Sequence, residues 1–282
     1  MINTPLSNND STRKDADACL ASTPAGARLV AEERPGRSRA HKFVKPGPFN
    51  GLLTNKLLTA LPGEDFARLL PHLEPVSLGA GEAVYRLGEV IQDVYFPETA
   101  VVVSHLYFME DGSMTAATIV GRDGLLGLST VFDAPPPSYW TQVTTGGSAL
   151  RVGRDVIKRE FARGSAMQRL LLSYTGTRLA QLSQRAVCNG RHRLDERLST
   201  WLLLIHDRAG EERLPLTHET MAHHLGARRA GVTDSCNVLR ESGAINNHRG
   251  MIHILDRQRL EASACECYRA LAPSVENPLR RK

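Results

Sequence analysis

The spacing of apolar residues changes from helical to strand-like and back again along the chain. Between Asn55 and Leu73, apolar side chains recur at helical intervals and predict a short helical segment. From about residue 75 to residue 152, short apolar runs are separated by turn signals, among them a hairpin at Glu110-Asp111-Gly112. Strands at such intervals predict an antiparallel roll or barrel.

A long helical pattern follows, from about Asp155 to Val187. Within it, leucine or small residues alternate at spacings of four and three: Leu172, Gly176, Leu179, Ser183 and Ala186. Such a seam lets two parallel helices approach closely and predicts a dimer interface. The alternative is a helix packed wholly within its own chain. We favour the dimer because the seam is separate from the apolar stripe that contains Ile157, Leu171 and Leu182.

The segment from Leu214 to Leu255 predicts a helix, a tight turn, a second helix and a β-hairpin. Asn189-Gly190 ends the long helix, and another helix, Arg193 to His206, leads into this segment. Thr217 is a good N-cap for the first short helix, and Gly226 suits its left-handed end. The second, at about 228–241, has a buried stripe of Val232, Cys236 and Leu239. Its outward face carries Arg229, Ala230, Thr233, Asp234 and Asn237.

This layout is that of a helix-turn-helix whose second helix can enter a DNA major groove. A turn predicted at residues 246–250 and a short strand at 251–255 add a wing. His248 and Arg249 at the wing tip suit phosphate contacts. The alternative is a purely structural lobe; Arg228 and Arg229, at the start of the exposed face, and the wing beside them favour DNA binding.

Composition is consistent with a two-domain cytoplasmic protein. The 282 residues carry a formal net charge of +5, which permits nucleic-acid binding without proving it. No apolar run approaches the roughly 20 residues of a membrane span, and we expect no membrane segment or signal peptide. Residues 1–50 are rich in polar residues and charge, and they predict a disordered tail.

The candidate ligands and nucleophiles predict neither a metal site nor an enzyme. Cys265 and Cys267 lie two residues apart on a predicted C-terminal helix, where such side chains do not face each other. His223 and His224 likewise point in different directions. We therefore expect no metal and no cofactor. Paired carboxylates, a nucleophile elbow and a lysine-bearing phosphate loop are absent from the sequence, so we expect no catalytic activity.

Taken together, the β-roll, the long helix and the winged helix-turn-helix resemble the Crp/Fnr family of bacterial transcription regulators. The resemblance covers about residues 52–272 and is strongest in LTHETMAHHLGARRAGVTDSCNVLRESGAI and HRGMIHILDRQRLEA. It implies an α+β fold with an N-terminal antiparallel β-roll, similar to cyclic-nucleotide-binding jelly rolls, a long dimerisation helix and a C-terminal winged helix-turn-helix. The corresponding division is a tail at 1–50, a sensor domain at 51–153, the dimerisation helix at 154–190, the DNA-binding domain at 191–272 and a tail at 273–282.

The resemblance also implies a homodimer that binds double-stranded DNA at a palindromic operator, with RNA polymerase as a candidate protein partner. Half-site centres would lie about 34–36 Å apart. Arg229, Ala230 and Asp234 fall on the positions that read base edges: an arginine suits guanine, an alanine a thymine methyl, and an aspartate cytosine N4. The candidates for contacts to the DNA backbone are Thr217, His218, Arg228, Thr233, His248 and Arg249.

The sensor turn departs from the cyclic-nucleotide pattern of the family. Binders of that type carry a glutamate after the cassette glycine and an arginine some ten residues on; here Leu125 follows Gly124, and PPPSYWTQV holds no arginine. A buried phosphate without a cation is costly, so we expect an effector other than cAMP. Arg122 precedes the glycine and suits a surface turn. The candidate pocket consists of Gly124, Leu125, Gly127, Trp140 and Thr141.

Iron–sulfur members of the family need clustered N-terminal cysteines, whereas this tail offers only Cys19. One alternative function stays open. The β-roll would be a ligand-sensing module that acts mainly through protein contacts, with weak DNA binding. The acidic side chain of Asp234 on the reading face favours that alternative.

Overall fold

The computed structural model describes residues 53–99, 102–111 and 113–272. The tails predicted at 1–50 and 273–282, and Gly112 of the predicted hairpin, lie outside these ranges. Residues 108–113 belong to one compact unit, and residues 53–107 and 114–272 to another. In the smaller unit, the Met109 amide donates to the Ser113 carbonyl over 2.9 Å. Everything below concerns the larger unit.

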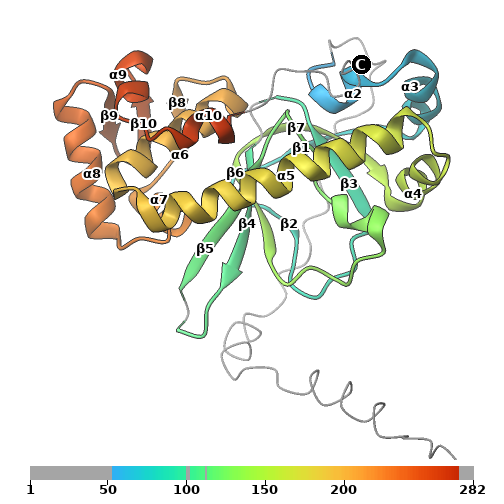
Figure 1. Cartoon of the computed structure of the whole chain (residues 1–282), viewed down its shortest axis with the longest axis horizontal. Helices are drawn as coiled ribbons and strands as arrows, with labels where there is room; N and C mark the ends of the chain where they lie inside the picture. Colours follow the sequence, from blue (N-terminus) through green and yellow to red (C-terminus); the bar gives the residue numbers. More distant parts are fainter. Residues whose placement is uncertain (1–52, 100–101, 112, 273–282) are drawn as a thin grey trace, which may run out of the picture. The chain divides into compact units, whose positions relative to one another are not determined.

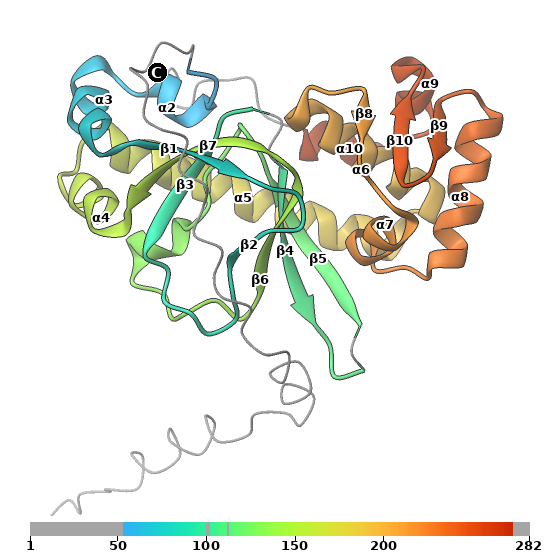
Figure 2. The same ribbon diagram turned by 180° about the vertical axis from the view of Figure 1, so that it is seen from behind.

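The predicted antiparallel roll is present as two sheets, ordered β1-β7-β3 and β2-β6-β4-β5 (Figures 1 and 2). Strand β7 pairs antiparallel with β1 and β3, and β6 with β2 and β4. Side chains alternate between buried and half-buried along β6, as expected for strands with one face on a core. The strands are β1 (Glu74–Leu78), β2 (Ala83–Tyr85), β3 (Asp93–Pro97), β4 (Val102–Phe108), β5 (Met114–Val120), β6 (Trp140–Thr145) and β7 (Gly147–Gly153).

The helical segment predicted between Asn55 and Leu73 is divided into α2 (Lys56–Ala60), α3 (Gly63–Leu69) and a 3₁₀ turn at Leu70–His72. Pro62 explains the break, because its ring cannot continue a helix from the preceding turn. Asn55 caps α2 by accepting from the Leu57 and Leu58 amides. Its own amide donates to the carbonyls of Pro97 and Gly124, both over 2.9 Å, and so fixes α2 to the roll.

The long helix also differs from its prediction at both ends. The segment from Asp155 is two helices, α4 (Arg154–Ala162) and α5 (Ala166–Arg191), separated where Gly164 adopts a φ of +70°. At the other end, α5 continues through Asn189-Gly190 to Arg191, with His192 as its C-cap. Local helix-breaking signals at 189–190 are overridden here by the packing of the end of α5 against the C-terminal lobe.

One face of α5 packs against the rest of its own chain through Leu170, Leu171 and Tyr174, all buried. Leu182, which the sequence placed on the same buried stripe, is 40% exposed. That position lies at the border of the buried face. The side chains that occupy the inner face on either side of it are Arg178 and Arg185, which bond to β5 and to α7.

The C-terminal lobe contains the predicted helices and hairpin in the predicted order, and in addition a short strand at Arg213–Leu214 and a helix at Arg257–Ala262 (Figure 1). Its centre is formed by Leu198, Trp201 and Leu202 of α6, packed with the inner stripe of α8. Burial of each large apolar side chain contributes about 1.5–3 kcal/mol to folding. Its sheet has the order β8-β10-β9. The elements are α6 (Leu194–Ala209), β8 (Arg213–Leu214), α7 (His218–Leu225), α8 (Arg229–Glu241), β9 (Ile245–His248), β10 (Met251–Ile254), α9 (Arg257–Ala262) and α10 (Cys267–Leu271).

A buried ion pair joins the roll to α6. Arg208 donates from Nε and Nη2 to the two carboxylate oxygens of Asp123, over 3.1 and 2.9 Å. The two side chains are only 2% and 10% exposed. Burial raises the pKa of Asp123, but the charges of Arg208 and Arg178 and the hydrogen bonds to the carboxylate together lower it below its usual value. Gly121 gives Arg208 room, because a Cβ there would lie 2.7 Å from Arg208 Cβ.

Asp123→Asn should therefore destabilise the protein strongly, because it leaves the Arg208 charge buried without its counter-charge. We expect a loss of about 3–5 kcal/mol in the free energy of unfolding, measured by urea titration. Asp133→Asn is the matched control: Asp133 pairs with Lys158 at the surface and should cost less than about 1 kcal/mol. Equal losses in the two variants would contradict the assigned role of the buried pair.

Candidate nucleic-acid interface

The N-terminal half of α8 is exposed on one side and anchored on the other. Val232 and Cys236 are fully buried, as the sequence predicted, and with Leu239 they fix the helix to the lobe. Arg228 is the N-cap residue of α8. It is exposed together with the three residues expected to read bases, Arg229, Ala230 and Asp234, whereas Thr233 and Asn237 are half-buried.

The helix that precedes α8 begins and ends as predicted. Thr217 caps α7 by accepting from the Thr220 amide over 3.1 Å. Gly226 closes it with a φ of +57°, a left-handed conformation that side chains with a Cβ disfavour. These two residues fix where α7 stops and therefore where the turn delivers α8.

His218 bridges α7, α8 and the hairpin. Its Nε2 accepts from the Asn247 side-chain amide over 3.3 Å, and its Nδ1 lies 2.9 Å from Thr233 Oγ1. Thr233 Oγ1 in turn donates to the Arg229 carbonyl. The sequence proposed His218 and Thr233 as backbone contacts; in the structure they also hold the start of α8 in place relative to the wing.

The wing turn is tighter than predicted. Residues 246–248 belong to strand β9, and only Arg249 and Gly250 form the turn, because His248 pairs with Met251. Both turn residues have positive φ, +46° for Arg249 and +78° for Gly250, as in a type I′ hairpin turn. Such a turn tolerates an arginine poorly, so the cationic side chain occupies this tip at some conformational cost.

A hollow of about 330 Å³ lies between the wing and the start of α8. The side chains around it include Arg229 from α8, His218 from α7, and His248 and Arg249 from the wing tip. The residues that line this hollow include no Asp or Glu. An anionic partner therefore meets guanidinium and imidazole groups there, which is the electrostatic character required to bind a phosphate backbone.

The back of α7 is fixed against the roll through His224, which is buried. His224 Nδ1 donates to the Thr220 carbonyl over 2.7 Å, and Nε2 accepts from Ser104 of β4 over 2.5 Å. Burial lowers the pKa of His224 to about 4, so the ring is neutral at physiological pH. Its neighbour His223 points elsewhere and pairs with Glu219, in agreement with the divergence expected from the sequence.

The turn that matches the phosphate cassette is occupied by the protein's own groups. The Leu125 amide donates to Tyr174 Oη of α5 over 3.4 Å, and the Leu126 amide to the Tyr95 carbonyl over 2.8 Å. A Cβ at Gly124 would overlap the Tyr174 hydroxyl. At Gly127, which has a φ of +87°, a Cβ would lie 2.8 Å from Tyr85 Oη. The amides that would cradle a phosphate thus already have acceptors.

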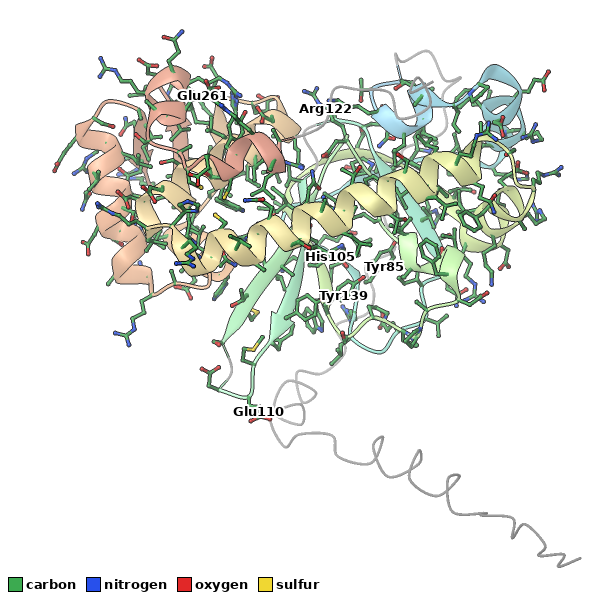
Figure 3. The ribbon with its side chains drawn as sticks, in the orientation of Figure 1. Tyr85, His105, Glu110, Arg122, Tyr139 and Glu261 are labelled. Atoms are coloured by element: carbon green, nitrogen blue, oxygen red, sulfur yellow. The ribbon has the colours of Figure 1, made fainter. Side chains whose placement is uncertain are left out.

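The remaining candidate effector residues, Trp140 and Thr141, are the first two residues of β6. Thr141 is buried, and its hydroxyl lies 2.9 Å from His105 Nδ1. The centroid of the His105 ring lies 4.6 Å from that of Tyr139, with the two rings tilted by 53°, and Tyr139 precedes half-buried Trp140 (Figure 3). Burial lowers the pKa of His105 to about 3, which keeps this part of the roll uncharged.

Arg122 does not take the place of the missing phosphate-binding arginine. Its guanidinium donates to the Asp207 carbonyl near the end of α6 over 3.2 Å. The residue lies in the surface turn before Gly124, as the sequence indicated, and it adds a second contact between that turn and α6.

All five residues of the predicted dimer seam are exposed along one face of α5. Leu172 and Leu179 are 48% and 62% exposed, large values for leucine. Nothing lies within 4 Å of the position of a Cβ at Gly176. Within the described residues this face is therefore exposed and largely apolar, which suits it to pack against another helix.

Comparison with known proteins shows what this geometry belongs to. Residues 196–263 match the family of Crp-like helix-turn-helix domains. This segment is a Crp-like helix-turn-helix domain. The comparison with curated protein sequences gave no match. In the described residues, none of the helices combines the length and the apolar character needed to cross a membrane.

Solved structures of other proteins share this fold at low sequence identity. FixK2 from Bradyrhizobium japonicum is 20% identical, with 68% of this chain and 98% of that chain covered and a TM-score of 0.58. TTHB099, a CRP-family transcriptional regulator from Thermus thermophilus, is 16% identical, with coverage of 71% and 99% and a TM-score of 0.55. The c-di-GMP responsive regulator CLP of Xanthomonas campestris is 13% identical, with coverage of 68% and 99% and a TM-score of 0.56.

One feature of the described residues was missed by sequence reasoning. Cys188, His192, Cys265 and Cys267 come together, with their potential ligand atoms all within 4.8 Å of one another. All four lie just outside the matched range 196–263, two on its N-terminal side and two on its C-terminal side. The sequence placed both C-terminal cysteines on one helix, but α10 begins only at Cys267. Cys265 precedes α10 in an irregular segment, where side chains two residues apart can point toward the same place. The available signal was the CxxxH spacing, hidden by the premature helix end at 189–190.

Proposed function

We propose that this chain is a homodimeric, sequence-specific DNA-binding regulator in which each subunit inserts α8 into the major groove of one half of a palindromic operator. The observation that carries the proposal is the exposed start of α8, with Arg228 and Arg229, facing a hollow that the wing completes with Arg249. A helix presented in this way beside a cationic wing is the arrangement used by winged helix-turn-helix proteins on duplex DNA.

Within this proposal the side chains of the interface have different tasks. Arg229 contacts a guanine through two hydrogen bonds, and Ala230 meets a thymine methyl. Asp234 accepts from cytosine N4, so the operator differs from sites read by an arginine at that position, and Asn237 lies deeper on the same face. Arg228, Thr217, His248 and Arg249 contact phosphates. His218 and Thr233 hold α8 at the angle that these contacts need.

The exposed carboxylate of Asp234 is also the observation that favours the second candidate function, a sensing module that acts mainly through protein contacts. A carboxylate close to a phosphate backbone weakens binding to every sequence equally. Sequence-selective protection of DNA distinguishes the first proposal from this one. RNA polymerase is the protein partner that a DNA-bound regulator of this type would contact.

The dimer is supported by the exposed seam on α5. Its leucines and small residues lie on the face opposite Leu170 and Tyr174, so the helix is held by its own chain on one side and free on the other. Two parallel copies packed along this seam would present two α8 helices related by two-fold symmetry, which is what a palindromic operator requires.

We infer further that the cassette turn does not bind a cyclic nucleotide. Leu125 replaces the glutamate that would bind the ribose, Tyr174 occupies the space next to Gly124, and the amides of the turn are already bonded. A phosphate placed here would have to displace a buried phenol without gaining an arginine partner.

Arg229→Ala should lose selectivity at one base pair in each half-site, because only a bidentate donor discriminates guanine there. With an operator selected from random duplex DNA, fluorescence anisotropy should show a loss of about 1–3 kcal/mol per subunit contact. Arg249→Ala should instead weaken binding to all duplexes and lower the slope of log K against log salt. Arg269→Ala, exposed on α10, is the control. If neither interface variant alters DNA binding, the interface is misassigned.

Leu179→Arg should convert the protein to a monomer, because it places two charges opposite each other in the centre of an apolar seam. Analytical ultracentrifugation gives the mass of the species directly. Thr177→Arg introduces the same side chain at an exposed position on another side of α5 and should leave the dimer intact. A parent protein that sediments as a monomer, or a Leu179→Arg variant that stays dimeric, would refute the seam.

Millimolar cAMP or cGMP should leave the melting temperature of the full chain unchanged. A ligand present at 100 times its Kd stabilises a folded protein by about 2.7 kcal/mol, which a thermal melt detects easily. A saturable rise in the melting temperature with either nucleotide would contradict the proposal that the cassette turn binds no cyclic nucleotide.

A further inference from the structure

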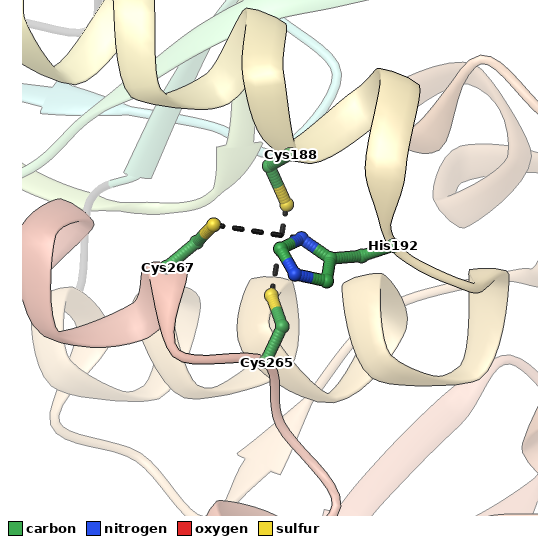
Figure 4. A group of neighbouring side chains, drawn as sticks. All are labelled: Cys188, His192, Cys265 and Cys267. Atoms are coloured by element: carbon green, nitrogen blue, oxygen red, sulfur yellow. Dashed lines mark hydrogen bonds between the residues drawn. The ribbon is translucent and has the colours of Figure 1, made fainter.

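Four potential metal ligands meet where α5 ends and α6 begins (Figure 4). Cys188 and His192 are four residues apart at the end of α5, which places them on one face of that helix. Cys265 lies between α9 and α10, and Cys267 is the first residue of α10. The three cysteines are buried, and the His192 side chain is 17% exposed, which leaves one edge of the group open to solvent.

The spacing of these atoms fits a single tetrahedral ion. Zn–S and Zn–N bonds of about 2.3 and 2.0–2.1 Å place two sulfurs about 3.8 Å apart, and a sulfur and a nitrogen about 3.5 Å apart, around a tetrahedral centre. Cys188 Sγ lies 3.6 Å from Cys265 Sγ, and Cys267 Sγ lies 3.5 Å from His192 Nδ1. These two pairs are thus already at the separations that the ion would impose.

Neighbouring groups support the same assignment. His192 Nε2, on the far side of the ring, lies 3.2 Å from a Glu266 carboxylate oxygen, so Nδ1 is left to act as the ligand. The Gln184 side-chain amide donates to Cys267 Sγ over 3.0 Å, and the Thr200 hydroxyl lies 3.1 Å from Cys265 Sγ. Hydrogen-bond donors to sulfur suit thiolates better than thiols, and a histidine–carboxylate pair is the usual outer partner of a metal-bound imidazole.

We propose that Cys188, His192, Cys265 and Cys267 bind one Zn²⁺ ion in a structural Cys₃His site. Three thiolates and a neutral imidazole form a complete tetrahedral set, and binding releases the thiol protons to solvent. An iron–sulfur cluster usually takes four thiolates and holds them around several iron atoms, so it fits this compact group less well. The ion fastens the C-terminal segment to the junction of α5 and α6, where the dimerisation helix passes into the DNA-binding lobe.

The test uses the full chain, purified anaerobically with a thiol reductant and a non-chelating buffer. Elemental analysis should find about one zinc per chain. After removal of zinc with a chelator, titration with Co²⁺ should give the intense near-ultraviolet thiolate-to-cobalt band and the visible bands of a tetrahedral complex, saturating at one equivalent. Adding Zn²⁺ should abolish these bands and raise the melting temperature. None of these readouts involves DNA, so their outcome is independent of the proposed operator binding.

Alanine variants at the four positions identify the ligands. Cys188→Ala, Cys265→Ala, Cys267→Ala and His192→Ala should each reduce retained zinc at least tenfold and change the cobalt spectrum. Cys236→Ala is the matched control, because Cys236 is equally buried but lies in α8, away from the group. It should keep one zinc per chain and an unchanged spectrum.

The parent protein alone is enough to overturn the proposal, even if a variant fails to fold. Chelator-treated parent that shows no cobalt band and no zinc-dependent rise in melting temperature refutes the site. Zinc retained by all four alanine variants refutes the ligand assignment. Parent protein that binds no metal and contains a Cys188–Cys265 disulfide would also refute the site, because the two cysteines would then form a covalent bond and not bind an ion.

Discussion

The buried ion pair between Asp123 and Arg208 is the contact on which the connection between the roll and the C-terminal lobe depends. Asp123 belongs to the turn that matches a phosphate cassette, and Arg208 to the helix at the centre of the winged lobe. Both charges are almost fully shielded from water, so each is tolerated only because the other is present. Gly121 belongs to the same constraint, since any larger residue would displace the arginine stem. The contacts of Arg122 with the Asp207 carbonyl and of His224 with Ser104 add to this connection.

From that junction the structure divides its tasks by helix face. The inner face of α5 packs against the roll, and its outer face carries the exposed apolar seam proposed to bind a second subunit. The inner stripe of α8 is buried in the lobe, and its outer face carries the arginines proposed to bind DNA. In each helix the 3.6-residue period sends one set of side chains to the core and another to the surface. The His218 and Thr233 hydrogen bonds then set the angle of α8 without using its exposed side chains.

The parts that the sequence predicted well are those with local signals. Thr217, Gly226 and the Val232–Cys236–Leu239 stripe define the helix-turn-helix within a few residues of one another. The errors arose where distant packing decides the outcome. Asn189-Gly190 is a typical helix end, yet α5 continues to Arg191 because the C-terminal lobe supports it. The cysteine–histidine group depends on residues 77 positions apart, Cys188 and Cys265, and no local periodicity reports such a meeting. The Tyr174 hydroxyl reaches the cassette turn from α5, and this contact too depends on tertiary packing that no local pattern reports.

Tyr174 of α5 connects the cassette turn with the helix that carries the exposed seam. Its hydroxyl fills the space beside Gly124, while Leu172 and Gly176, two positions to either side, belong to the outward seam. A rotation of α5 that withdrew Tyr174 from Gly124 would also turn the exposed apolar seam, so the two surfaces cannot change independently. Shortening the Tyr174 side chain in place would open the turn alone, but it would supply neither the glutamate nor the arginine that a cyclic nucleotide needs.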